Sequence, residues 1–202
     1  IGDWVIREAC RTAATWPEHL TLAVNLSAPQ FDKDRIVDVV TSSLAETGLL
    51  PGRLELEITE SLLIERPDDV LATLMRLKEL GVSIAMDDFG TGYSSLSYLL
   101  KFPFDKIKID KSFISAIDHD KAACDVLRTI GSLGKTLGIR ITAEGVETEE
   151  QVTFLRAIAC DQLQGYFFAK PLDSSGVATF LLGNAAQRLK TAETNTPSSK
   201  AA

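Results

Sequence analysis

Six short β-like runs alternate with helical patterns along this chain. The runs cover residues 20–27, 53–59, 82–88, 105–110, 139–144 and 161–168. Between the second and third runs, Val70, Leu74 and Leu77 recur at helical spacing, which predicts an amphipathic helix. Pro67 stands near the start of this helix and Gly81 just past its end, as is common at helix boundaries. Regular alternation of strands with helices predicts a parallel sheet covered by helices.

Two later segments are also predicted to be helical. A second apolar stripe, closed by Gly138, consists of Val126, Ile130, Leu133 and Leu137. Thr148 and Gln151 have the spacing of a capping box, in which both side chains bond the backbone at a helix start. We therefore expect one helix to end near Gly138 and another to begin near Thr148.

Each strand-like run has an aliphatic face and a face that becomes polar toward its C-terminal end. In the second run, Leu54, Leu56 and Ile58 share one face, and Glu55 and Glu57 share the other. The less aliphatic faces of the other runs hold Ala23 and Asn25, then Ser83, Ala85 and Asp87, then Lys106, Lys108 and Asp110, then Thr142 and Glu144, and finally Gln162 and Gln164. Parallel strands are usually buried on both faces, so these polar ends are expected to converge on one interior. The pattern predicts an α/β fold of the TIM-type (β/α) barrel, with the polar ends at its C-terminal mouth.

Carboxylates dominate the residues expected at this mouth. The set is Asn25, Glu57, Asp87, Asp88, Lys108, Glu144 and Gln164, with Glu147 just beyond. Crowded carboxylates raise one another's pKa or require a cation. Oxygen ligands with one amide and no histidine suit Mg²⁺ or Mn²⁺ rather than zinc. His19 and His119 fall outside the strand ends and are assigned no role.

This set of residues is typical of phosphate ester hydrolysis. Two ions ~3.5–4 Å apart can share a bridging carboxylate and clamp the attacking and leaving oxygens. The adjacent Asp87 and Asp88 suit that arrangement, Lys108 could offset developing charge, and Glu144 could accept a proton from the attacking water. From these residues alone, other Mg²⁺-dependent barrel chemistry, such as enolate formation, stays open.

Composition narrows the classes of partner. The net charge of −7 argues against a nucleic-acid binder that neutralises many phosphates, so no DNA or RNA binding is expected. The three cysteines, Cys10, Cys124 and Cys160, form no CxxC pair, which favours free thiols in a reducing cytoplasm. No signal pattern and no apolar run of membrane-spanning length occurs in the sequence.

Six segments of the chain contain most of these polar residues. They are Val24-Asn25-Leu26-Ser27, Leu54-Glu55-Leu56-Glu57-Ile58-Thr59-Glu60, Asp87-Asp88-Phe89-Gly90-Thr91-Gly92-Tyr93-Ser94-Ser95-Leu96, Lys108-Ile109-Asp110, Ala143-Glu144-Gly145-Val146-Glu147 and Gln164-Gly165-Tyr166. In order and spacing, these segments resemble the EAL family. The Asp-Phe-Gly triplet also occurs in protein kinases, but no glycine-rich phosphate loop or His-Arg-Asp segment accompanies it here.

The resemblance implies a function for the site. It implies metal-dependent hydrolysis of one phosphodiester bond of cyclic di-GMP to linear pGpG, using two Mg²⁺ or Mn²⁺ ions in a cytoplasmic protein. Implied metal ligands are Asn25, Glu57, Asp87, Asp88 and Glu144; implied catalytic residues are Lys108 and Glu144; implied substrate contacts are Gln164 and Glu147. A loop anchored by Glu60 would couple a homodimer to the metals; it comprises Gly90, Thr91, Gly92, Tyr93, Ser94 and Ser95. For Glu60, Glu147 and Asp110, plain helix-start charges are the alternative interpretation.

The resemblance also implies that part of the barrel is missing. Only six of the family's eight strand–helix units are expected here, without the first two strands and without the Glu-Ala-Leu motif. We expect residues 1–184 to form the incomplete domain and residues 185–202 a polar, disordered tail. The parent protein is expected to carry upstream sensory or synthase domains. The chain alone is expected to be poorly stable and slow or inactive, because its sheet edges are open and one metal would lack a ligand. The alternative is a catalytically inactive EAL-like module that binds cyclic di-GMP or a partner protein.

Overall fold

The structure, a computed structural model, describes residues 1–31, 35–65, 67–91 and 96–181. Residues 1–168 form one compact unit and residues 169–202 a second. In the second unit, residues 174–181 are helical. The expected tail, residues 185–202, lies outside the described residues.

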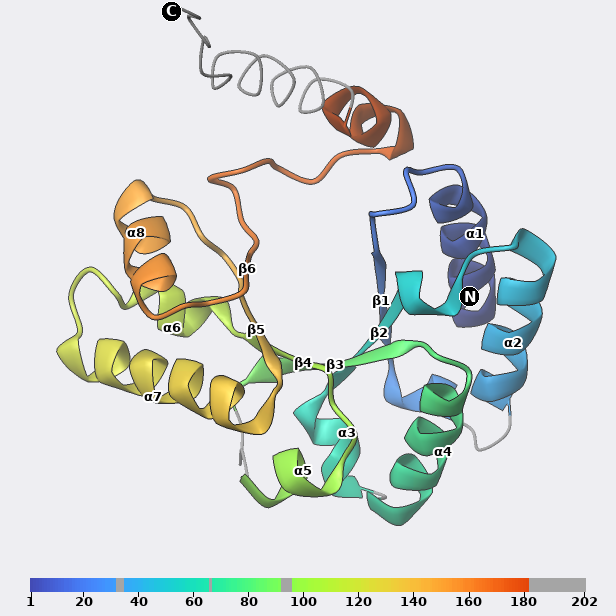
Figure 1. Cartoon of the computed structure of the whole chain (residues 1–202), viewed down its shortest axis with the longest axis horizontal. Coiled ribbons are helices and arrows are strands. Elements are labelled where there is room, and N and C mark those ends of the chain that lie inside the picture. Colours follow the sequence, from blue (N-terminus) through green and yellow to red (C-terminus); the bar gives the residue numbers. More distant parts are fainter. Residues whose placement is uncertain (32–34, 66, 92–95, 182–202) are drawn as a thin grey trace, which may run out of the picture. The chain divides into compact units, whose positions relative to one another are not determined.

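A single parallel sheet organises the first unit. Its six strands pair in chain order and are β1 (Leu22–Leu26), β2 (Leu54–Thr59), β3 (Ser83–Phe89), β4 (Lys106–Ile109), β5 (Arg140–Ala143) and β6 (Gln162–Leu163). Figure 1 shows that the sheet curls into a half-barrel. The predicted α/β fold with six barrel-type strand–helix units is therefore confirmed.

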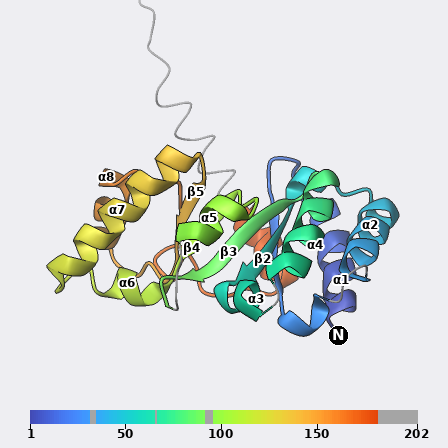
Figure 2. The ribbon, with the colours of Figure 1, turned by 90° about the horizontal axis from the view of Figure 1, so that it is seen from below.

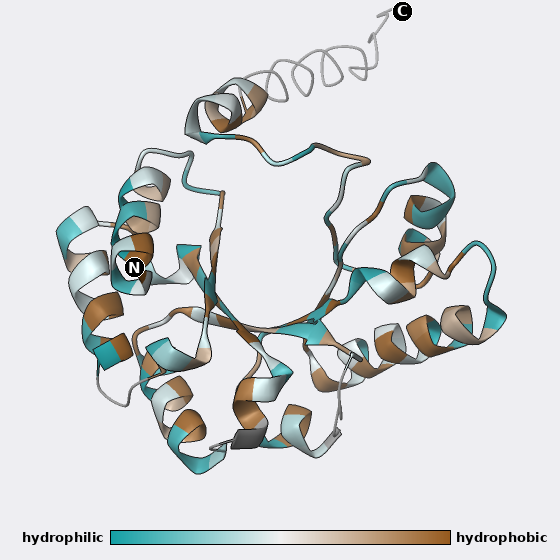
Figure 3. Ribbon diagram, turned by 180° about the vertical axis from the view of Figure 1, so that it is seen from behind, coloured by the Kyte–Doolittle hydropathy of each residue, from teal (hydrophilic) through white to brown (hydrophobic). Residues whose placement is uncertain are grey.

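Helices lie on the outer side of this curl. The longer ones are α1 (Gly2–Ala14), α2 (Arg35–Thr47), α4 (Pro67–Glu79), α7 (Lys121–Leu137) and α8 (Glu149–Ala157), and the shorter ones α3 (Glu60–Glu65), α5 (Leu96–Lys101) and α6 (Lys111–Ser115), with 3₁₀ turns η1 (Ala28–Gln30) and η2 (Pro51–Arg53). The turned view in Figure 2 shows α4, α5 and α7 along the same side of the strands. Hydrophobic and hydrophilic residues alternate along these helices in Figure 3, as expected for elements that bury one face.

The predicted helix ends are confirmed. Gly138 adopts the left-handed conformation with φ of +70° and ends α7. At the start of α8, the backbone N–H of Gln151 donates to the Thr148 side chain, and the reciprocal capping-box bond is also present. Both devices satisfy backbone groups that a helix terminus leaves unpaired.

The buried face of α7 differs from the predicted stripe. Val126 is 43% exposed, whereas Leu127 is fully buried. The helix approaches its neighbours through Gly131 and Gly134, where an added Cβ would lie 2.9 Å from the Ile158 carbonyl oxygen and 2.6 Å from Ile141, respectively. The two glycines allow the close approach on this face, and a pattern of bulky apolar side chains does not include them.

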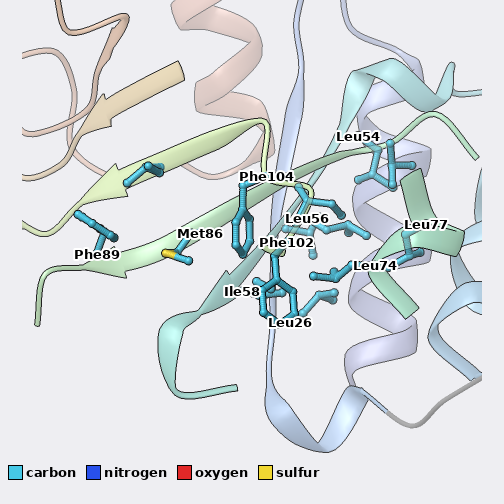
Figure 4. Packing of buried hydrophobic residues seen from close by; sticks show 14 of the residues in the cluster. Leu26, Leu54, Leu56, Ile58, Leu74, Leu77, Met86, Phe89, Phe102 and Phe104 are labelled. Carbon is cyan, nitrogen blue, oxygen red and sulfur yellow. The ribbon is translucent and has the colours of Figure 1, made fainter. Parts of the chain in front are cut away.

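The aliphatic faces of the strands pack against the helices. Leu54, Leu56 and Ile58 of β2 are fully buried, and Leu74 and Leu77 of α4 are equally inaccessible. Figure 4 shows these side chains gathered between the sheet and the helix. Each fully buried side chain of this size contributes about 1.5–3 kcal/mol relative to exposure. This packing fixes which strand face turns inward.

The last strand is shorter than the predicted run over residues 161–168. β6 covers only Gln162–Leu163, because the chain turns at Gly165 to pack against Val146. A Cβ on Gly165 would lie 2.1 Å from the Val146 carbonyl oxygen, so no larger residue fits this position. The backbone N–H of Val146 donates to Gln164 and that of Phe167 donates to Val146, which holds the turn.

A buried arginine joins the N-terminal helix to the sheet. The Arg53 guanidinium donates to the carbonyl oxygens of Ala13 (2.8 Å), Trp16 (3.4 Å), Pro17 (3.2 Å) and Leu20 (2.8 Å). These carbonyls lie at the C-terminal end of α1 and in the connection to β1, where regular helical hydrogen bonds end. Two of them also accept backbone N–H groups, Ala13 from Trp16 and Pro17 from Leu20. Arg53 thus adds a donor to four carbonyls of one connection.

Replacing this arginine is expected to weaken the fold strongly. Arg53→Met should lower the free energy of unfolding by ~2 kcal/mol, because the buried guanidinium and its hydrogen bonds to four carbonyls are lost. Arg128→Met is the matched control, since Arg128 forms an exposed ion pair with Asp125 and should change stability by less than ~1 kcal/mol. Thermal unfolding by scanning calorimetry measures both, and equal midpoints for the two variants would contradict the assigned role.

Candidate active site

A buried ammonium lies at the centre of the acidic cluster. Lys108 Nζ on β4 is 2.7 Å from Glu57 Oε2, 2.7 Å from Glu144 Oε1 and 3.0 Å from Asp87 Oδ1. The Lys108 side chain is only 6% exposed. The carboxylates come from β2, from β3 and from the residue that follows β5, so one cation ties together four strands.

Asn25 on the edge strand β1 joins the same cluster. Its register partner on β2 is Glu57. With the amide oriented so that its nitrogen faces the carboxylates, Asn25 donates to Asp87 Oδ2 at 3.0 Å and to Glu57 Oε2 at 3.2 Å. The predicted meeting of Asn25, Glu57, Asp87, Lys108 and Glu144 is therefore seen in this geometry.

Asp88 reaches the cluster through an unusual backbone conformation. Consecutive residues of a regular strand point to opposite faces. At Asp88, however, φ is +55°, and the β3–β4 register shifts between Met86 and Phe89. Asp87, Asp88 and Glu144 can consequently offer carboxylate oxygens within 4.8 Å of one another.

Thr91 holds this conformation in place. Its backbone N–H and its hydroxyl both donate to the Asp88 carbonyl oxygen, at 3.2 and 2.9 Å. The Asp88 N–H donates to Asp87 Oδ1 at 3.1 Å. Left-handed backbone is unfavourable for non-glycine residues, and aspartate tolerates it better than most. The adjacent acids therefore share a site because of a local irregularity in the strand.

The charges of the cluster perturb one another. Burial raises the pKa of Glu57, and the negative charges of Asp87 and Glu55 act in the same direction, while Lys108 opposes them. Burial and the neighbouring Asp87 charge raise the pKa of Asp88. Burial disfavours the Lys108 ammonium, but its hydrogen bonds to Glu144 and Glu57 outweigh burial and hold its pKa above the ordinary value. The carboxylates around Lys108 therefore favour its charged form.

The donor set fits hard divalent cations. Among the described residues, four carboxylates (Glu57, Asp87, Asp88 and Glu144) face a single ammonium, which leaves three negative charges in excess when all are ionised. Carboxylate and amide oxygens are the ligands that Mg²⁺ and Mn²⁺ prefer. Such a cluster can bind these ions, and no histidine or cysteine contributes to it.

A cavity of about 250 Å³ adjoins the acidic cluster. Its lining residues are Asp110, Lys111, Glu144, Gly145, Glu147, Gln164, Gly165 and Tyr166. Glu147 and Gln164, the expected substrate contacts, therefore lie beside Glu144 in this cavity and not among the ion pairs. Asp110 caps α6, where its carboxylate accepts from the Ser112 N–H at 2.9 Å.

Only part of the expected coupling loop can be compared with the structure. Gly90 has φ of +97° and packs against Phe113, which leaves no room for a side chain. Glu60, the first residue of α3, is 4% exposed. Gly92, Tyr93, Ser94 and Ser95 lie outside the described residues, so their coupling to a dimer stays a prediction.

Sequence reasoning missed a second buried ion pair beneath the cluster. Lys106 Nζ lies 2.6 Å from Glu55 Oε1, and both side chains are less than 8% exposed. These residues were expected on the inner strand faces but received no role. The signal was present in the sequence, because Glu55 and Lys106 precede Glu57 and Lys108 by two residues each.

The comparisons with known proteins identify the family. The model of the EAL domain matches residues 1–171. The chain therefore belongs to the EAL domain family. The chain is 44% identical over 176 residues to MucR of Pseudomonas aeruginosa, a bifunctional diguanylate cyclase/cyclic di-GMP phosphodiesterase. The match covers 85% of this chain and 26% of MucR.

Solved structures agree with this assignment. The PaMucR phosphodiesterase in its c-di-GMP complex superposes with a TM-score of 0.83 at 42% identity, covering 87% of this chain and 73% of that one. The manganese/cy-diGMP complex of Klebsiella pneumoniae BlrP1 superposes with a TM-score of 0.75 at 30% identity. The match covers 84% of this chain and 44% of the BlrP1 chain. The chain spans about a quarter of the length of the first curated relatives. Within the described residues, no helix is both long and apolar enough to cross a membrane.

The backbone at Asp88 provides a test of the site geometry. Asp88→Asn keeps a residue that tolerates positive φ and removes one negative charge from a repulsive cluster, so metal-free thermal stability should be unchanged or higher. Asp88→Val should lower the free energy of unfolding by ~1–2 kcal/mol, because a β-branched residue disfavours that conformation. Calorimetric melting of both variants in a chelator checks this, and a valine variant as stable as the asparagine variant would refute it.

Proposed function

We propose that this domain hydrolyses one phosphodiester bond of cyclic di-GMP and releases linear pGpG, with two Mg²⁺ or Mn²⁺ ions as cofactors. The observation that carries the proposal is the cluster in which Glu57, Asp87 and Glu144 surround Lys108 at the C-terminal end of the sheet. This is the end at which barrel enzymes place their chemistry. The printed descriptions of MucR and PaMucR, which name a cyclic di-GMP phosphodiesterase and a c-di-GMP complex, supply the substrate class.

Five residues would hold the cations. Glu57, Asp87, Asp88 and Glu144 would offer carboxylate oxygens. Asn25 would offer its amide oxygen after its amide turns from the orientation in which its nitrogen donates to Asp87 and Glu57. When bound, such ions supply an activated water and neutralise charge on the phosphoryl oxygens. The manganese complex of BlrP1 supports this assignment of the metal class.

Lys108 would act as a fixed positive charge. Its hydrogen bonds to Glu144 and Glu57 hold its pKa above the ordinary value, which favours the charged ammonium. Its ammonium can donate to the attacking water or offset the charge that develops on the phosphate in the transition state. The surrounding carboxylates already orient it, so little reorganisation is needed during the reaction.

Glu144 is the best-placed proton acceptor of the cluster. Its side chain is 20% exposed, compared with 7% for Glu57 and 12% for Asp87. It also lines the adjoining cavity, together with Gln164 and Glu147. In the proposed mechanism the substrate lies in this cavity, Gln164 and Glu147 contact it, and Glu144 takes the proton of the attacking water.

The domain is proposed to work as part of a larger protein. The printed name of MucR combines synthesis and hydrolysis of cyclic di-GMP in one protein. By analogy, we propose that this domain works in a larger cytoplasmic signalling protein with a synthase or sensory domain, and that it acts as a homodimer.

The central test is hydrolysis of cyclic di-GMP by the full gene product in Mg²⁺ or Mn²⁺. Asp87→Asn should reduce kcat by about a hundredfold or more, because it removes a charge that the reaction centre depends on. Asp125→Asn, an identical change in an exposed ion pair on α7, should leave kcat unchanged. Chromatographic measurement of pGpG over time distinguishes the variants. Binding of cyclic di-GMP without turnover in the wild-type protein would instead identify a receptor.

A further inference from the structure

A second layer of charge lies directly below the proposed metal site. Glu55 and Lys106 form a 2.6 Å ion pair inside the half-barrel, and Arg140 Nη2 is 3.9 Å from the other Glu55 oxygen. Neither member of the pair contacts the proposed reaction centre. A buried ion pair of this kind gives little net stability, because desolvation of both charges offsets their attraction. Stability alone therefore does not account for it.

The strand register describes how near Lys106 stands to Glu57. Ala85 on β3 pairs with Glu57 on β2 and with Lys106 on β4, so Lys106 and Glu57 are separated by one strand that carries only a methyl group at that point. The Lys106 ammonium bonds Glu55, two residues before Glu57 on β2. Lys108 shows the same offset, because Asp87, which it contacts on β3, pairs with Thr59, whereas Lys108 bonds Glu57.

The pairing sorts the interior charges into two groups. The lower group, Glu55 with Lys106, is neutral as a pair, whereas the upper carboxylates share only Lys108 and keep an excess of negative charge. A second ammonium in the upper group would remove part of that excess. It would also occupy an oxygen of Glu57 that a cation needs.

We propose that Glu55 is a positioning residue that holds Lys106 away from Glu57, so that the upper carboxylates remain negative enough to bind divalent cations. The inference rests on the proposed use of divalent cations at this site. Lys106 in turn offsets the Glu55 charge and reduces what it adds to the field at the metals. The pair therefore sets the affinity of the site for divalent cations. Glu55 raises this affinity and Lys106 lowers it.

The two members can be removed separately by near-isosteric changes. Glu55→Gln frees the Lys106 ammonium to turn toward Glu57 and should weaken Mn²⁺ binding about tenfold, since a unit charge acts on a divalent ion across a short, poorly screened distance. Lys106→Met leaves the Glu55 charge beneath the site and should tighten Mn²⁺ binding by about the same factor. The double variant removes both charges of the pair and leaves only the half-exposed Arg140, so it should bind Mn²⁺ nearly as the wild-type protein does.

Stability provides the contrast that separates positioning from mere support of the fold. Both single variants leave a buried charge without its main partner, so both should lower the thermal midpoint. Lys78→Met is the matched control: Lys78 forms a 2.6 Å ion pair with Asp105 outside the site, and its loss makes the same change in net charge. It should lower the midpoint without tightening Mn²⁺ binding.

The experiment is titration calorimetry of Mn²⁺ into the full gene product and these variants, with Asp87→Asn as the baseline that removes binding at this site. The inference is supported if Glu55→Gln weakens Mn²⁺ binding, Lys106→Met tightens it, and the double variant has nearly the wild-type affinity. Shifts in the same direction, no shift, or no Asp87-dependent binding in the wild-type protein overturn it. Mn²⁺ binding that follows the expected pattern without hydrolysis of cyclic di-GMP would sink the proposed function alone.

Discussion

The burial of the Lys108 ammonium among three carboxylates is the interaction on which the arrangement of the site depends. Taking charges out of water is unfavourable unless each finds its partners at close range. The contacts at 2.7 to 3.0 Å therefore require the strands that carry Glu57, Lys108 and Asp87, and the end of β5 before Glu144, to keep one register. A slip of one residue would turn these side chains toward the aliphatic helices.

The outer face of the sheet makes that register secure. Leu54, Leu56 and Ile58 alternate with Glu55 and Glu57 on β2, so burial of the first set against α4 forces the second set inward. Ala85 then supplies the space through which acids on β2 and lysines on β4 meet across β3. The hydrophobic packing and the ion pairs are thus two consequences of one alternation, and neither could change register without the other.

This alternation is why so much could be predicted from the sequence. A period of two distinguishes inward from outward residues on every strand, and parallel topology brings the strand ends to one mouth, so Asn25, Glu57, Asp87 and Glu144 could be grouped without coordinates. Other features depend on contacts that periodicity does not encode. The positive φ of Asp88 follows from a register shift between β3 and β4. The short β6 follows from the close approach of Gly165 to Val146, and the pairing of Lys106 with Glu55 is seen only in the distance between their side chains.

The site also shows why binding and stability make opposite demands on the same residues. A centre that attracts divalent cations must keep more carboxylates than ammonium groups, and burial together with mutual repulsion raises the pKa of Glu57 and Asp88. Excess negative charge and left-handed backbone both oppose folding, so they persist only where the surrounding packing over-determines the structure. The half-barrel meets this condition because fully buried aliphatic residues on the outer faces of the strands anchor the backbone that carries the acids. The neutral Glu55–Lys106 pair completes the arrangement, because it fills the interior below the acids without reducing the charge that the cations need.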